Sequence, residues 1–164
     1  MVIATYVAVV IIQLYMTTEN SQNIPRTGKS LLIVDDEQDI CDSLESRLKA
    51  AGFQVQTAPN GREAVATFIK YFYEAPFDVI LLDINLPDMD GVDILKLFRQ
   101  EEDLRGVDYG DGVIIIMQTA VKESWMNAFN KGCDDYIIKP YSFQELLNKI
   151  NEKIQIKKER SELK

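Results

Sequence analysis

Residues able to carry phosphoryl chemistry recur directly after short apolar runs in this 164-residue chain. Asp35 and Asp36 follow the first run, Asp83 follows a later one, and Thr119 and Lys139 end two more. Clustered carboxylates repel one another and raise each other's pKa unless a cation neutralises them. A hard divalent ion with oxygen ligands, Mg²⁺ first, is the natural occupant of such a cluster.

One carboxylate beside such an ion can attack phosphorus, as in enzymes that form an aspartyl phosphate. The phosphoryl oxygens then need the metal, a cation and a hydroxyl donor. Asp83 is the best-placed nucleophile, and Lys139 and Thr119 supply the cation and the hydroxyl. Each residue alone has a structural explanation as a cap, a turn residue or a surface charge. Their joint occurrence after apolar runs favours a shared site.

A nucleotide-binding P-loop is a competing interpretation of the first run. Gly28, Lys29 and Ser30 match the end of the motif G-x-x-x-x-G-K-[ST], but the first glycine of that motif would fall on Asn23. The motif also leads into a helix, whereas a short β-branched apolar run typical of a buried strand follows here. The sequence therefore disfavours a P-loop.

The elements that must position these residues alternate along the chain. Apolar runs predict strands at 31–34, 53–57, 78–82, 113–117 and 136–138, and amphipathic stretches predict a helix after each one. Asn60 and Ser142 begin capping boxes, and Trp125 and Phe129 mark the fourth helix. This order predicts an α/β fold with a doubly wound parallel sheet. Ligands bind outside the carboxyl ends of such strands, where the candidate residues fall.

Composition narrows the possible functions. The net charge is −8, with an acidic body and a short basic stretch near the C-terminus, so we expect no direct nucleic-acid binding. The chain has no histidine, which makes a zinc site and a phosphohistidine on this chain unexpected. Cys41 and Cys133 are far apart in sequence, and two free buried thiols suit a reducing, cytoplasmic setting.

We divide the chain into three parts. Residues 1–29 combine an apolar segment with a polar leader, residues 30–158 form the domain, and residues 159–164 form a charged tail. The apolar segment has three interpretations. The first is a misassigned start or a loose tail, with Met16 as the alternative start. The second is a weak membrane anchor, and the third is an extra strand. As a helix it would span roughly 24 Å, short of the roughly 30 Å hydrocarbon core, so we expect no membrane partner.

Four motifs together resemble the receiver domain of two-component response regulators: LLIVDDE, LLDINLPDMDG, IIMQTA and GCDDYIIKPYS. The resemblance covers residues 30–158 and is to the stand-alone, single-domain type. It implies a flavodoxin-like sheet of five strands in the order 2-1-3-4-5 with five helices. Three stretches depart from the pattern: the loop 104–112 and the region 71–77 are longer than usual, and the segment 119–132 is shorter.

The resemblance also implies a role for each acidic residue. Asp83 is the phospho-acceptor. Mg²⁺ is the cofactor, bound by the side chains of Asp36 and Asp83 and by the carbonyl of Asn85, with Asp35 acting mainly through water.

By the same resemblance, Thr119 and Lys139 bind the phosphoryl group, and the bond between Lys139 and Pro140 is cis, which a tertiary amide permits at modest cost. Tyr136 matches the switch aromatic of the family, with Thr119 as the other switch residue. A core residue whose hydroxyl reaches the edge is an equally good interpretation of Tyr136.

The resulting hypothesis is a phosphorelay receiver that accepts a phosphoryl group from a histidine kinase or a histidine phosphotransfer protein. It catalyses only its own phosphorylation and dephosphorylation. It signals to a downstream protein, or to a second copy, through a face made of the fourth helix, the fifth strand and the fifth helix. One alternative is an aspartyl-phosphate phosphatase of the haloacid-dehalogenase type, which needs an acid where Asn85 stands. The other is an interaction module that is never phosphorylated.

Overall fold

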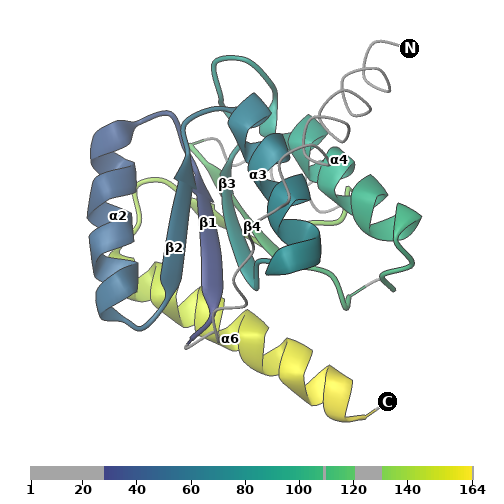
Figure 1. Ribbon diagram of the computed structural model, residues 1–164. Helices are drawn as coiled ribbons and strands as arrows, with labels where there is room; N and C mark the ends of the chain where they lie inside the picture. The colour runs from purple at the N-terminus through teal and green to yellow at the C-terminus, as the bar shows by residue number, and fades with distance from the viewer. Residues whose placement is uncertain (1–27, 109, 121–130, 164) are drawn as a thin grey trace.

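The computed structural model describes residues 28–108, 110–120 and 131–163. Within these ranges a five-stranded sheet is covered on both faces by helices (Figure 1). The strands are β1 (Ser30–Val34), β2 (Gln54–Ala58), β3 (Val79–Asp83), β4 (Ile114–Thr119) and β5 (Asp135–Ile138). The helices described are α2 (Gln38–Ala50), α3 (Gly61–Glu74), α4 (Gly91–Leu104) and α6 (Phe143–Glu162).

The strand order is β2-β1-β3-β4-β5, and every neighbouring pair is parallel. The order and the doubly wound architecture confirm the predicted fold class. The burial of each strand explains whether its sequence is continuously apolar or alternates between apolar and polar residues. All residues of β1, β3 and β4 are buried, as continuous apolar runs require. The edge strand β2 alternates between exposed and partly buried positions over its first four residues and ends at the buried Ala58.

Two hydrophobic clusters hold the layers together. The side chains that point to one face of the sheet pack against α3 and α4, with Phe68 stacked on Phe98 at the centre. Those that point to the opposite face pack against α2 and α6, where Leu48 and Ile150 are fully buried. Because side chains alternate along a strand, Asp35, which directly follows β1, and Asp83 at the end of β3 continue the row that faces α2 and α6.

Local capping signals in the sequence are confirmed. The side chain of Asn60 accepts a hydrogen bond from the backbone N–H of Glu63 at 2.9 Å and begins α3. Ser142 does the same for the N–H of Glu145 at 3.1 Å and begins α6. Four of the five predicted helices fall within the described residues, and the predicted fourth helix around Trp125 lies outside them, as does the N-terminal segment 1–27.

The last helix is longer than the sequence divisions suggest. It continues to Glu162, so most of the charged stretch 159–164 is helical. Figure 1 shows its C-terminal turns projecting past the sheet. No helix in the described ranges has both the length and the apolar character needed to cross a bilayer.

Candidate functional site

The turn after β3 holds the end of that strand in a defined place. A Cβ at Gly91 would lie 2.1 Å from the carbonyl oxygen of Asp83, so only glycine allows α4 to begin this close to the strand. The N–H of Gly91 donates to the carbonyl of Ile84 at 2.8 Å, and Asp90 caps α4 by accepting from the N–H of Val92 at 2.7 Å. The backbone on both sides of the Asp83 carboxylate is therefore restrained.

Sequence reasoning missed the function of another acid in this turn. The Asp88 carboxylate accepts hydrogen bonds from the N–H groups of Gly61 at 2.8 Å and Arg62 at 3.0 Å, at the start of α3. Burial tends to raise the pKa of Asp88, but these backbone bonds and the nearby Arg62 lower it below its ordinary value overall. The turn that follows Asp83 is thus tied to a helix that precedes it in the chain, through a contact that no local motif announces.

The centre of the site is an ammonium shared by two carboxylates. Lys139 Nζ donates to Asp35 Oδ2 at 2.7 Å and also to Asp83 Oδ2. The Asp35 side chain is 0% exposed and the Asp83 side chain 8%, while that of Lys139 is 18% exposed. The three groups come from the ends of β1, β3 and β5, which the parallel sheet brings to one edge.

The second oxygen of each carboxylate is also used. Asp35 Oδ1 accepts from the N–H of Glu37 at 3.0 Å, and Asp83 Oδ1 accepts from the N–H of Asn85 at 2.9 Å. These bonds fix the orientation of both side chains. The Glu37 carboxylate lies 4.0 Å from Lys139 Nζ but is 64% exposed, so it contributes little to the site.

The electrostatics of the site keep Lys139 charged. Burial alone lowers the pKa of Lys139, but the hydrogen bonds and negative charges of Asp35 and Asp83 outweigh it and hold the pKa above its ordinary value. One positive charge therefore faces two negative ones on a partly open edge. That arrangement attracts a further cation, and it presents a permanent ammonium to any anion that docks on Asp83.

The structure places the other predicted residues around this centre. Thr119 ends β4 and is 1% exposed, and its carbonyl accepts from the N–H of Lys139 at 2.8 Å. The bond between Lys139 and Pro140 is cis, which is the isomer the resemblance implies. Tyr136 on β5 is partly buried against the α3 and α4 side of the sheet, and the ammonium of Lys149 lies 5.9 Å from its ring centroid.

The donor set suits a hard divalent cation, although the described residues contain no group of three acidic, histidine or cysteine side chains drawn close enough to hold a metal ion. The ammonium of Lys139 bridges two of the acids, and Asp36 is exposed beside them. The available ligands are carboxylate and carbonyl oxygens, which Mg²⁺ prefers. The set therefore fits Mg²⁺ by chemistry.

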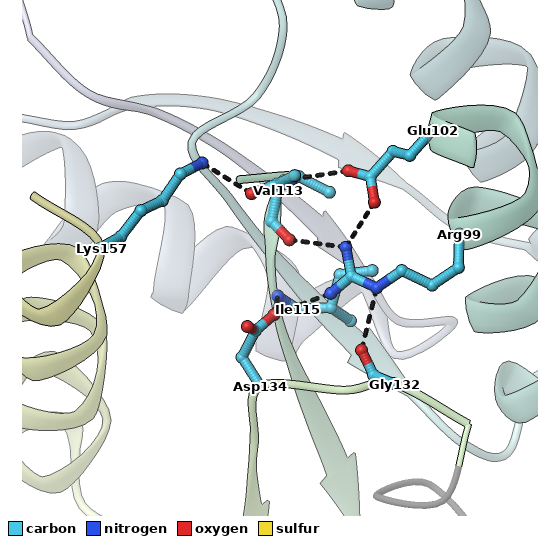
Figure 2. A network of polar contacts seen from close by, with 8 residues as sticks. Arg99, Glu102, Val113, Ile115, Gly132, Asp134 and Lys157 are labelled. Carbon is cyan, nitrogen blue, oxygen red and sulfur yellow. Dashed lines mark hydrogen bonds and ion pairs between the residues drawn. The ribbon is translucent and has the colours of Figure 1, made fainter. Parts of the chain in front are cut away.

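A second polar network lies at the opposite end of β4 (Figure 2). Arg99 on α4 donates to the carboxylates of Glu102 and Asp134, each at 2.7 Å, and to the carbonyls of Val113 and Gly132, each at 2.9 Å. The same two carboxylates also accept from the N–H groups at the start of β4. The network anchors the chain just before β5. Its one sign in the sequence is Arg99, a charged residue next to the apolar positions of an amphipathic helix.

Comparison with known proteins identifies the class. Residues 31–151 match the family model described as response regulator receiver domain, so the chain belongs to the receiver domain family. A solved CheY-like receiver domain protein from Methanospirillum hungatei is 34% identical, with a TM-score of 0.68 over 82% of this chain and 99% of that one. The response regulator TrrA of Thermotoga maritima, solved in complex with Mg²⁺-BeF, is 30% identical with a TM-score of 0.62, over 76% of this chain and 98% of that one.

The curated relatives of this chain are named as regulators of transcription. The probable transcriptional regulator ycf27 of Cyanidium caldarium is 38% identical over 133 residues, which is 80% of this chain and 47% of the relative. The transcriptional regulatory protein PrrA of Mycobacterium tuberculosis is 33% identical over 124 residues, 76% of this chain and 49% of the relative. This chain thus spans about half the length of the relatives it matches.

Proposed function

We propose that this chain is a phospho-accepting receiver in which Asp83 takes a phosphoryl group from a histidine kinase or a histidine phosphotransfer protein. The observation that carries the proposal is the Lys139 ammonium bridging Asp35 and Asp83 at the carboxyl edge of the sheet. An acid buried at a strand end and held beside a permanent cation is oriented as a nucleophile toward an incoming anion.

The transfer step balances within this arrangement. An oxygen of the Asp83 carboxylate forms a bond to phosphorus as the bond between phosphorus and the donor's imidazole nitrogen breaks, and that nitrogen keeps the electron pair and regains a proton. Lys139 and the Thr119 hydroxyl stabilise the phosphoryl oxygens. In a separate hydrolysis step, the oxygen of water forms a bond to phosphorus as the bond between phosphorus and the Asp83 oxygen breaks. Inorganic phosphate leaves, a proton of the water passes to solvent, and the Asp83 carboxylate is regenerated.

Mg²⁺, when bound, would neutralise charge on the phosphoryl oxygens, and Asp36, Asp83 and the Asn85 carbonyl would hold it. Asp35 has a different task in our proposal. Because its carboxylate contacts Lys139 directly, it positions the ammonium and contributes negative charge to the metal site, either at a distance or through water.

Family membership favours a receiver over the haloacid-dehalogenase alternative, which the presence of Asn85 already disfavours. The expectation of no nucleic-acid partner finds no support in the relatives, which are named as transcriptional regulators. We propose a protein partner for the described part of the chain, contacted through β5 and α6, where Lys149 and Lys153 both pair with Asp135.

The decisive test of phospho-acceptance is labelling by a small-molecule phosphodonor in the presence of Mg²⁺. The parent should form a hydroxylamine-sensitive acyl phosphate, and Asp83→Asn should form none because an amide is not a nucleophile. Asp93→Asn is a matched control, since Asp93 is an exposed acid on α4, and this variant should label like the parent. Equal labelling of the parent and Asp83→Asn would refute the acceptor assignment, and an unlabelled parent would favour an interaction module that is never phosphorylated.

A further inference from the structure

A buried amide lies next to the candidate site without a complete set of hydrogen bonds. Gln118 is 0% exposed and stands in register with Asp83 on β3 and Ile137 on β5. Alternation along β4 directs its side chain to the same face as Asp83, the side covered by α2 and α6. Its Oε1 accepts a hydrogen bond from the hydroxyl of Tyr141, and its Nε2 has no partner among the described residues.

Stability does not explain a glutamine at this position. An unpaired buried N–H costs free energy, whereas an apolar side chain of similar shape would avoid that cost. Buried polar groups that are incompletely paired occur where function requires them. The partner of Gln118 indicates what that function is.

Tyr141 connects Gln118 to the catalytic lysine. It stands two residues after Lys139, and its ring packs in the cluster between the sheet, α2 and α6. The backbone N–H of Lys139 already donates to the carbonyl of Thr119 at 2.8 Å. The segment that carries Lys139 is therefore tied to two consecutive residues of β4, by backbone at Thr119 and by side chains at Gln118.

These ties limit where the Lys139 ammonium can go. The ammonium has to reach both Asp35 and Asp83, and it is the end of a long side chain whose freedom depends on the backbone beneath it. Burial raises the pKa of Tyr141 to about 12, so the hydroxyl stays protonated and available as a donor at neutral pH. The hydroxyl can therefore donate to Gln118 under the conditions in which a phosphoryl group would transfer.

We propose that Gln118 and Tyr141 form a positioning pair that holds Lys139 against Asp83 for phosphoryl transfer. The proposal rests on the proposed function of Asp83 and adds two residues that act through Lys139 without touching the phosphoryl group. The pair lowers stability slightly and increases the rate of transfer by keeping the ammonium in place. Small displacements of a group that stabilises the transition state cost large factors in rate.

Two conservative substitutions test the pair. Tyr141→Phe removes one hydroxyl and keeps the ring, and Gln118→Met removes the amide and keeps a similar shape. Each should slow labelling of Asp83 by a small-molecule phosphodonor with Mg²⁺ about tenfold. The double variant should be no slower than either single variant, because both remove the same hydrogen bond. The double variant should melt at the parental temperature or above it, because it leaves neither partner of the hydrogen bond unpaired.

Tyr71→Phe is a control for Tyr141→Phe, because it removes a tyrosine hydroxyl that also bonds to a glutamine. Gln56 on the edge strand donates to the hydroxyl of Tyr71 at 3.0 Å, far along the sheet from Lys139. Tyr71→Phe also removes a hydrogen bond between a tyrosine and a glutamine, here an exposed one in which the hydroxyl accepts, and should leave the labelling rate unchanged. The ¹⁵N–¹H signal of the Lys139 ammonium should shift in Tyr141→Phe and stay in place in Tyr71→Phe.

The outcomes separate this proposal from the one it rests on. A parent that is not labelled, or an Asp83→Asn variant that still is, overturns the assignment of Asp83 and the pair with it. A parent labelled at Asp83, with Tyr141→Phe and Gln118→Met labelled at the parental rate, overturns the positioning pair alone. Slow labelling that matches a loss of folded protein in both variants also overturns it, because the pair would then serve only the fold.

Discussion

Replacing Lys139 by methionine gives the most direct measure of the electrostatics at the site. The substitution keeps most of the side-chain volume and removes the cation from two carboxylates that are 0% and 8% exposed. Breaking a buried ion pair by removing one partner costs about 3–5 kcal/mol, because the remaining charge is left uncompensated. Since the Lys139 side chain is 18% exposed, we expect the lower end of that range, about 3 kcal/mol.

Mg²⁺ should restore part of this loss. A ligand that binds only the folded state stabilises it by about 2.7 kcal/mol at a concentration one hundred times its Kd. Without the ammonium, Asp35 and Asp83 attract a cation more strongly, so Lys139→Met should gain more stability from Mg²⁺ than the parent does. Asp36 is the exposed acid beside them, and adding Asp36→Ala should remove most of that gain.

Urea unfolding followed by circular dichroism, with and without Mg²⁺ at constant ionic strength, measures both effects. Lys29→Met is the matched control, because Lys29 pairs with Asp78 at 3.0 Å while 55% exposed, and its loss should cost less than about 1 kcal/mol. The raised pKa of Lys139 means that its contribution is complete below the ordinary lysine pKa and declines only at strongly alkaline pH. Equal losses of unfolding free energy in Lys139→Met and Lys29→Met would refute the reasoning. So would the absence of any stabilisation by Mg²⁺ in both the parent and Lys139→Met.

Three further predictions concern residues that take no part in the proposed phosphoryl transfer. Arg99→Met should lower the free energy of unfolding by about 3 kcal/mol, because it removes the cation from two carboxylates. The control Lys96→Met breaks an exposed ion pair on the same helix and should cost less than about 0.5 kcal/mol. Similar urea midpoints for the two variants would contradict this prediction. Asp88→Ala should cost about 1 kcal/mol by removing the acceptor at the start of α3, measured by thermal melting. Burial raises the pKa of Cys41 to about 11 and of Cys133 to about 12, so a thiol reagent should label them at neutral pH only after unfolding. These raised values also mean that stability falls as pH rises above the ordinary thiol value of 9.0.

The sequence alone predicts much of the fold because the signals for it are local. Continuous apolar runs mark β1, β3 and β4, which are buried on both faces, and alternation marks the edge strand β2. The side chains of Asn60 and Ser142 cap the helices that they precede by accepting hydrogen bonds three residues away. Once parallel strands are inferred, their carboxyl ends meet at one edge, so Asp35, Asp83 and Lys139 are expected there before any coordinate is known.

Only the tertiary structure decides which of these groups touch. The preceding apolar run does not show which of the two acids is buried. Asp35 is buried against Lys139, in line with the row of β1 that faces α2 and α6, whereas Asp36 lies in the bend after the strand and is exposed. The capping of α3 by Asp88 joins residues 26 and 27 apart, and the bond between Tyr141 and Gln118 joins residues 23 apart.

Such contacts leave no periodic trace in the sequence. They depend on the spacing of neighbouring strands and on side-chain conformations that are set only when the layers pack. The sequence therefore determined the elements and the edge where the site forms, whereas the packed sheet determined the bonds between its residues.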